Sequence, residues 1–170
     1  MTFVARTLQV VGALSIAIIT GVCSYIAYSV ATNSDQVDKA SSKDVAFVFN
    51  RSGLSTTQEF KVLSSFESVR SGTGDHLDRY CIQLSEFKIA DPQEKDWSAF
   101  SSLDVTAQGV VSEALVAGEA EQCFIGKAID PAELKTYVWS ITIHRRIANA
   151  YDVILFDPTT KRLLYVGYKS

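Results

Sequence analysis

The C-terminal part of the chain decides the fold class. Residues 136–168 read TYVWSITIHRRIANAYDVILFDPTTKRLLYVGY. Three runs within this stretch, at 136–146, 151–157 and 162–168, are rich in β-branched and aromatic residues. Because only a few residues separate the runs, neighbouring runs must pair as antiparallel strands. The sequence therefore predicts a three-stranded meander.

Side-chain alternation predicts how the meander is placed. The second run, YDVILFD, is apolar on both faces, which is typical of a central strand. In the first run, alternation predicts one face with Tyr137, Trp139, Ile141 and Ile143, and an opposite face with Ser140, Thr142, His144 and Arg146.

Helical patterns precede the meander. Ser55 and Gln58 have the spacing of a capping box, and apolar residues at helical intervals follow as far as Val69, which predicts a helix there. A second helical pattern covers 105–117. Asp130 followed by Pro131 has the form of a short helix start.

Two further strands complete the expected domain. Residues 79–89 alternate in strand fashion, and residues 123–125 form a short apolar run. We therefore expect an α+β domain in which one or two helices pack on an antiparallel sheet.

The N-terminus has a different character. Residues 10–31 are almost entirely apolar or small, and no charged side chain lies between Arg6 and Asp35. A helix of this length covers roughly 33 Å, which matches the hydrocarbon core of a bilayer. We expect a signal anchor at 10–31, a short tail at 1–9, a polar linker at 32–44 and a folded domain at 45–170. The alternatives are a buried helix and a signal peptide cleaved after Ala31, which would give a soluble exported domain.

The cysteines bear on the compartment. Cys81 and Cys123 lie in the expected domain, where one disulfide is the most economical pairing if the domain is exported. The alternative is a pair of separate buried thiols. We expect a single-pass protein of the inner (plasma) membrane, with its N-terminus in the cytoplasm and its domain outside, in the periplasm.

Small residues mark one stripe of the expected anchor. Ala13, Ala17 and Gly21 follow one another at four-residue spacing. Such a stripe lets a second helix approach closely, so it is a candidate homodimer face.

Several function classes lack support in the composition. The chain has 16 Lys and Arg against 19 Asp and Glu, a formal net charge of −3, so it lacks the basic footprint of a nucleic-acid binder. It contains 2 His and no His-Glu-x-x-His, Cys-x-x-Cys or phosphate-binding glycine motif. We therefore expect no metal, no cofactor and no redox chemistry.

One basic cluster is a candidate binding site. His144, Arg145 and Arg146 follow one another near the end of a predicted strand. Arginine forks bind carboxylates and anionic headgroups directionally, so an anionic partner is expected. The alternative is a solvated strand end that prevents edge pairing.

These observations favour a membrane-anchored, extracytoplasmic binding or assembly module with a protein partner in the envelope. In layout alone, the chain resembles bitopic envelope proteins of bacteria, such as secretion or pilus assembly subunits and membrane-anchored immunity proteins. The alternative is a tethered or secreted hydrolase whose site is assembled from separated residues, with His76, Asp78 and His144 as candidates. The sequence nominates no activated nucleophile, which favours the binding module.

Overall fold

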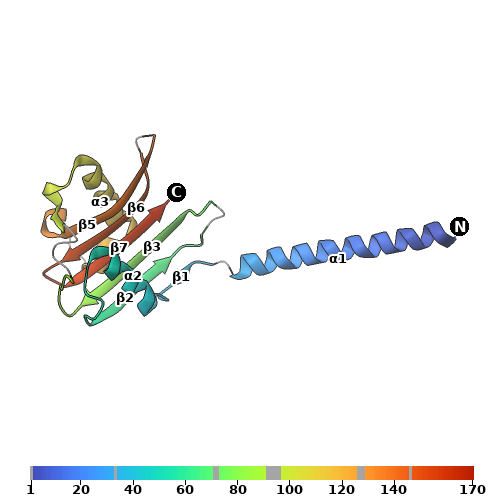
Figure 1. The fold of residues 1–170 in the computed structure, drawn as a ribbon, viewed down its shortest axis with the longest axis horizontal. Helices are drawn as coiled ribbons and strands as arrows, with labels where there is room; N and C mark the ends of the chain where they lie inside the picture. The colour runs from blue at the N-terminus through green and yellow to red at the C-terminus, as the bar shows by residue number, and fades with distance from the viewer. Residues whose placement is uncertain (1, 33, 71–72, 91–96, 126–128, 146) are drawn as a thin grey trace. The chain divides into compact units, whose positions relative to one another are not determined.

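The structure is a computed structural model of the whole chain (Figure 1). It describes all residues except 1, 33, 71–72, 91–96, 126–128 and 146, and it describes no side chains at 2–11, 13 and 29–32. The chain divides into two compact units, Met1–Ser34 and Asp35–Ser170.

The first unit is one helix, α1 (Thr2–Thr32). The segment predicted to span a membrane, 10–31, lies within it. Among the residues that the structure describes, no helix is both long enough and apolar enough to cross a bilayer. The membrane-spanning role of this segment therefore stays a sequence-based prediction.

The second unit contains a seven-stranded sheet in the order β1-β2-β3-β7-β6-β5-β4, in which every neighbouring pair is antiparallel. The strands are β1 (Gln36–Val37), β2 (Phe60–Glu67), β3 (His76–Leu84), β4 (Ser98–Ala99), β5 (Lys135–His144), β6 (Ile147–Asp157) and β7 (Arg162–Lys169). The predicted α+β class and the C-terminal meander β5–β6–β7 are confirmed.

The details of the meander differ from the prediction. Residues 148–150 belong to β6 instead of separating two strands, because the hairpin turns immediately after His144. In addition, β5 carries an irregularity between Val138 and Ser140. One extra residue in a strand reverses the alternation beyond it. Tyr137 and Ile141, predicted on one face, therefore pack into the cores on opposite faces of the sheet.

The helix predicted after Ser55 is wrong, because this stretch forms strand β2, which pairs with β3 along its length. Ser55 and Gln58 do not cap a helix. Instead, the Gln58 side-chain oxygen accepts a hydrogen bond from the Lys88 backbone N–H (3.3 Å). The spacing of Phe60 and Phe66 is compatible with a helix as well as with a strand. This stretch is a strand because it pairs with β3.

A helix lies where the sequence predicted the end of a linker. Helix α2 (Ser42–Ser52) begins after Ser41, whose backbone N–H donates to Asp44 Oδ2 (2.6 Å), and ends at Gly53 with a left-handed φ of 68°. Asp44 at the third helical position is a capping signal that the sequence reading missed. The segment 32–44 is therefore partly structured, since it contains β1 and the start of α2.

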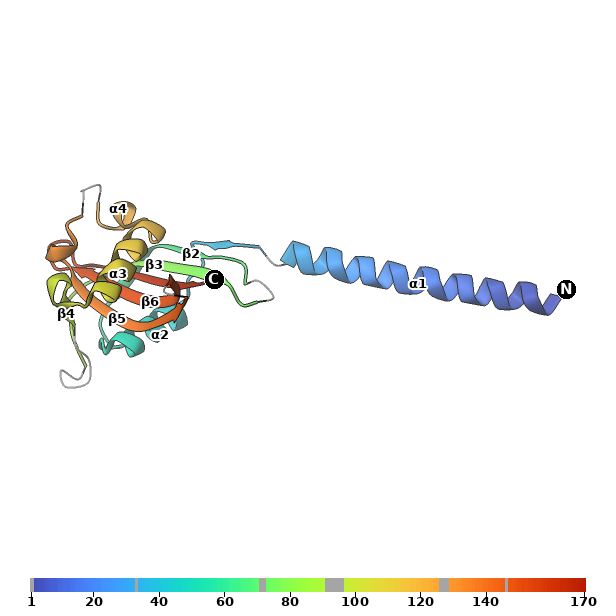
Figure 2. The same cartoon turned by 90° about the horizontal axis from the view of Figure 1, so that it is seen from above.

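Helices cover both faces of the sheet, as Figure 2 shows. Helix α2 lies on one face, and α3 (Val105–Ala117) and α4 (Ala120–Cys123) lie on the other. Two 3₁₀ turns, η1 (Phe100–Ser102) and η2 (Pro131–Glu133), complete the unit.

On the face of the sheet that α3 covers, two predictions are confirmed and one is wrong. Helix α3 has the predicted bounds, and Asp130 caps η2 as expected by accepting from the Ala132 N–H (2.9 Å). The strand predicted at 123–125 is wrong, because Cys123 ends helix α4. A short apolar run does not by itself distinguish a strand from a buried helical turn.

Each face of the sheet has its own core. On the α2 face the fully buried side chains include Val45, Val48, Phe49, Ile82, Ile154 and Leu163. On the α3 face they include Val111, Ala114, Val153, Leu155 and Val166. The central strands are thus buried on both sides, as the sequence of β6 predicted.

Candidate functional site

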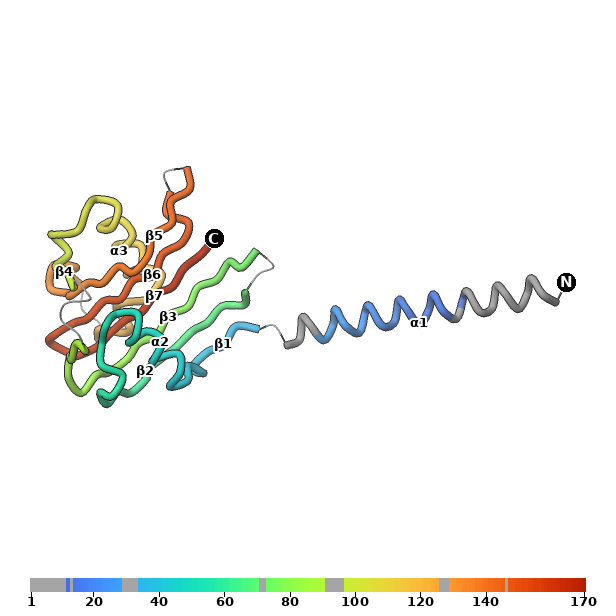
Figure 3. Tube along the Cα trace, viewed as in Figure 1, coloured from blue at the N-terminus to red at the C-terminus, as the bar shows by residue number. Residues whose placement is uncertain are grey.

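The β5–β6 hairpin projects beyond the rest of the sheet (Figure 3). The last residue of β7 in the ladder, Lys169, lies opposite Ala150 of β6. Ile147 and Ala148 therefore extend past β7 and pair only with β5. The tip of this hairpin carries the predicted basic cluster.

The structure places His144 and Arg145 on the surface of this tip. Arg145 occupies the turn with a left-handed φ of 50°. Arg146, the third member of the predicted cluster, lies outside the described residues. The tip thus presents basic side chains to solvent at the end of two paired strands.

Two large apolar side chains flank these basic residues. Ile143 is 54% exposed and Ile147 is 71% exposed. His144 pairs with Ile147, so the two isoleucines come from facing strands of one hairpin. Single exposed apolar residues are ordinary, but a basic tip between two exposed isoleucines has the composition of a contact surface. We call residues 143–145 and 147 the hairpin tip.

The edge beside the hairpin tip is only partly covered. Strand β4 pairs with Lys135 and Thr136 at the start of β5, and within the described residues no strand pairs with the outer edge of β5 beyond them. The irregularity at Val138/Ser140, where Trp139 is the extra residue of β5, interrupts this edge. Such bulges disfavour the addition of a further strand.

The alternative hypothesis, a hydrolase, rests on His76, Asp78 and His144. The fold brings only two of these residues together. His76 and Asp78 lie on the same face of β3, with His76 Nε2 3.9 Å from Asp78 Oδ2. Arg70 also reaches Asp78 Oδ2, at 2.8 Å. His144 is on β5, and two strands, β7 and β6, separate it from β3. The three residues therefore do not form one site.

Asp78 is almost fully buried, and this affects its ionisation. Burial raises the pKa of the Asp78 carboxyl above its usual value, against the opposing effect of the Arg70 and His76 charges. Its Oδ1 atom is buried and has no hydrogen-bond partner among the described residues, while Oδ2 accepts from Arg70. A carboxyl held in this way by an arginine is typical of a structural ion pair as well as of a catalytic acid.

Neighbouring groups form a polar row across the same end of the sheet. Glu67, Asp78, Gly167 and Asp152 face one another in register on β2, β3, β7 and β6. Two buried tyrosines bridge to this row: Tyr80 donates to Glu67 Oε1 and Tyr165 donates to Asp152 Oδ1, both at 2.8 Å.

The tyrosines of this row are hydrogen-bond donors and not bases. Burial, together with the nearby carboxylates, raises the pKa of the Tyr80 and Tyr165 hydroxyls well above the usual value. Their hydroxyls therefore keep their protons and hold the carboxylates in place. Gly167 leaves the space that this arrangement needs, because a Cβ there would collide with the Tyr165 hydroxyl.

The chemistry available at this row is limited. Among the described residues there is no cluster of three or more His, Cys, Asp or Glu side chains that could hold a metal ion. No hydroxyl or thiol pairs with His76, whose Nδ1 atom lies 2.8 Å from the Gly74 carbonyl, in any contact that the described residues show. The contacts of the polar row link neighbouring strands, and they show no activated nucleophile among the described residues.

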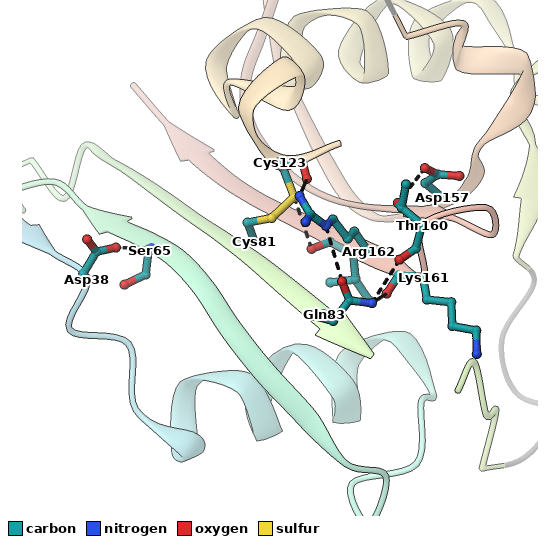
Figure 4. Close-up of a disulfide and its surroundings, with 10 residues drawn as sticks. Asp38, Ser65, Cys81, Gln83, Cys123, Asp157, Thr160, Lys161 and Arg162 are labelled. Atoms are coloured by element: carbon teal, nitrogen blue, oxygen red, sulfur yellow. Dashed lines mark hydrogen bonds between the residues drawn. A yellow bond between two sulfur atoms is a disulfide. The ribbon is translucent and has the colours of Figure 1, made fainter. Parts of the chain in front are cut away.

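A disulfide joins Cys81 of β3 to Cys123 at the end of α4, as the sequence predicted (Figure 4). Both cysteines are nearly fully buried in the core on the α3 face. The bond fastens the short helix α4 to the sheet, since four helical residues make little stable structure alone.

Arg162 supports the same junction, and Figure 4 shows its guanidinium between Cys123 and Gln83. Its Nη1 donates to the Cys123 carbonyl (2.7 Å) and its Nε donates to Gln83 Oε1 (3.3 Å). The Gln83 amide in turn donates to the Thr160 carbonyl (2.9 Å). Polar contacts therefore hold the end of α4 beside the disulfide.

The small-residue stripe of α1 is described in part. Ala17 and Gly21 are exposed, and the side chain of Ala13 lies outside the described residues. Nothing in the structure bears on a helix partner at this stripe.

Sequence reasoning found the basic cluster and the disulfide but missed the polar row. Alternation in β6 places Asp152 on the same face as Ile154 and Phe156, which is a signal for a polar group on an otherwise apolar face. The partners from other strands depend on registers that the sequence does not fix.

Comparisons with known proteins add no assignment. No family model matches the chain, and neither a curated protein nor a solved structure matches it.

Proposed function

We propose that this protein is a membrane-anchored binding or assembly module, and that the hairpin tip is its contact surface for a protein partner in the envelope. The observation that carries the proposal is the pair of exposed isoleucines, Ile143 and Ile147, around His144 and Arg145. Apolar anchors beside an arginine are characteristic of protein–protein contact surfaces.

The proposed anchor is the apolar segment 10–31. Its support is the absence of charge between Arg6 and Asp35 and a length that matches a bilayer. Anchoring restricts the domain to the membrane surface, which raises the local concentration of a partner held in the same membrane.

The proposed orientation has a cytoplasmic N-terminus and an extracytoplasmic domain. The disulfide Cys81–Cys123 supports it, because such bonds form and persist in oxidising compartments. In alkaline carbonate the full chain should stay in the membrane pellet, whereas a chain without residues 1–31 should be released. Release of the full chain would contradict the anchor, and an intact mass beginning at Thr32 would indicate cleavage.

A binding role is favoured over the hydrolase because the candidate residues His76 and Asp78 are separated from His144. The row around Asp78 contains protonated tyrosines and paired carboxyls, which suit a structural role.

The binding role is tested by a matched pair of exposed apolar residues. Ile147→Ser removes an anchor at the hairpin tip, where Ile147 is 71% exposed, and Val105→Ser removes a side chain of α3 that is 85% exposed. Both variants should fold with wild-type stability, since exposed positions contribute little. In membranes, chemical cross-linking of the full chain to its partner should fall about tenfold, roughly 1.4 kcal/mol, for Ile147→Ser alone. Equal yields for the two variants would contradict the proposal.

A further inference from the structure

We infer that the partner of the hairpin tip is a second copy of this chain, which receives the tip in an acidic groove at the opposite end of the sheet. This inference rests on the proposed function, because it names the surface that the tip contacts. It follows from the shape of the groove, its charge and its distance from the tip.

The groove consists of three adjoining hollows beside α4, η2 and β4, with volumes of about 370, 220 and 570 Å³. The first two share Ile129, and the last two share Glu133 and Leu134. Phe124 and Leu134 give the middle hollow an apolar floor. We call this surface the acidic groove. It offers apolar cover for a pair of isoleucines that would otherwise stay exposed.

The rim of the acidic groove is negative. Carboxylates of Glu121, Asp130 and Glu133 are exposed along it. The one cation among the described lining residues is Lys135, whose ammonium lies over the Phe87 ring, 4.7 Å from its centroid. Among the described lining residues, acidic side chains outnumber this one exposed lysine, so this part of the groove is negative overall and complements a basic partner.

The hairpin tip complements the acidic groove in charge and in apolar surface. It carries His144 and Arg145 where the groove carries carboxylates, and it exposes Ile143 and Ile147 where the groove has an apolar floor. Arginine at a contact of this kind forms directional hydrogen bonds to carboxylates. The two surfaces are thus matched in both charge and polarity.

A chain cannot place its own tip in its own groove. Lys135, which lines the groove, begins β5, and His144 ends it. A strand of ten residues spans roughly 30 Å, and β5 is held in the sheet along this length. The contact must therefore join two copies, from the tip of one to the groove of the next. Such a head-to-tail contact can be repeated from copy to copy.

The test uses complementary charge reversals in the purified full chain, held in detergent micelles. Arg145→Glu reverses the tip, and Glu133→Lys reverses the rim of the groove. Self-association is measured by sedimentation velocity over a range of concentrations. The wild-type chain should associate, and each single variant alone should associate about tenfold more weakly. The matched controls, Lys61→Glu and Glu59→Lys, change charge at exposed residues of the β2 region and should behave like the wild type.

Mixing the two single variants gives the decisive result. The mixture retains an intact tip on one chain and an intact groove on the other, so the two variants should associate with each other. The double variant Arg145→Glu/Glu133→Lys should also regain self-association, because its charges are exchanged.

Three results would overturn the second-copy inference. These are a monomeric wild-type chain, association that neither single variant weakens, and a mixture that fails to recover. None of them affects cross-linking of the tip to a different protein in membranes, so the proposed function is judged separately by the Ile147→Ser comparison.

Discussion

The two ends of β6 are built from the same kinds of residue and have opposite surroundings. At one end, Ile154 and Leu155 are fully buried, one in each of the two cores. At the other end, Ile147 is 71% exposed at the hairpin tip. The difference shows that apolar residues in one strand can serve folding in one place and remain available for contact in another.

The largest expected effect on stability comes from a substitution in the buried end of β6. Leu155→Ala should destabilise the protein by about 2–5 kcal/mol, because it leaves a cavity in the core. Ile147→Ala should change stability by about 0.5 kcal/mol at most. Urea denaturation followed by tryptophan fluorescence measures both. Similar losses for the two variants would show that the tip is part of the folded core.

The disulfide should have the next largest effect, because it fastens α4 to the buried end. Replacing Cys81 and Cys123 together by Ala should cost about 2–4 kcal/mol, since the bond closes a loop with a sequence separation of 42. The matched control is Cys23→Ala, which removes the exposed free cysteine of α1. A shift in the urea midpoint for the control as large as for the double variant would contradict this role.

The polar row lies between the two ends and depends on Gly167. Gly167→Ala should destabilise the protein by about 1–3 kcal/mol, because the new Cβ collides with the Tyr165 hydroxyl. In contrast, Gly109→Ala lies inside α3 with open space around it and should stabilise the protein by about 0.5–1 kcal/mol. Thermal unfolding distinguishes the two. A neutral Gly167→Ala would mean that Tyr165 moves away without loss.

The smallest expected effect is a pH dependence from Asp78. Since burial raises its pKa in the folded state, the folded protein binds the proton more tightly than the unfolded chain. The proton on Asp78 therefore stabilises the folded protein. This stabilisation is fully present when the pH is below the ordinary pKa of 3.8, and it is lost as the pH rises through the higher folded-state pKa.

Asp78→Asn should therefore flatten the fall in the free energy of unfolding across this pH window. Urea titrations at several pH values measure the slope, with Glu59→Gln as the control on an exposed carboxyl. A slope that Asp78→Asn leaves unchanged would assign the pH dependence to another group.

The sequence was sufficient to predict secondary structure where local patterns and tertiary structure agree. Helix α3, the cap at Asp130 and the strands β5 to β7 follow directly from periodicity and turn residues. It was insufficient where two periods competed, as at Phe60–Glu67, or where a bulge reversed the alternation after Val138. Both depend on strand pairing, which involves residues far apart in the chain.

The candidate site shows the same division. His144 and Arg145 were recognised because consecutive basic residues are visible in sequence. The exposure of Ile143 and Ile147 was not predicted, because the turn was predicted at 148–150, later than it occurs. The acidic groove combines residues from α4, η2 and β4, so only the folded chain reveals it.

The most direct test of the binding role places a photo-cross-linking residue, p-benzoylphenylalanine, at position 147 or at position 105 of the full chain in its native membrane. We predict a protein adduct at position 147 that Arg145→Glu weakens, and no adduct at position 105. Equal adducts at the two positions, or an adduct of position 147 with lipid alone, would contradict it.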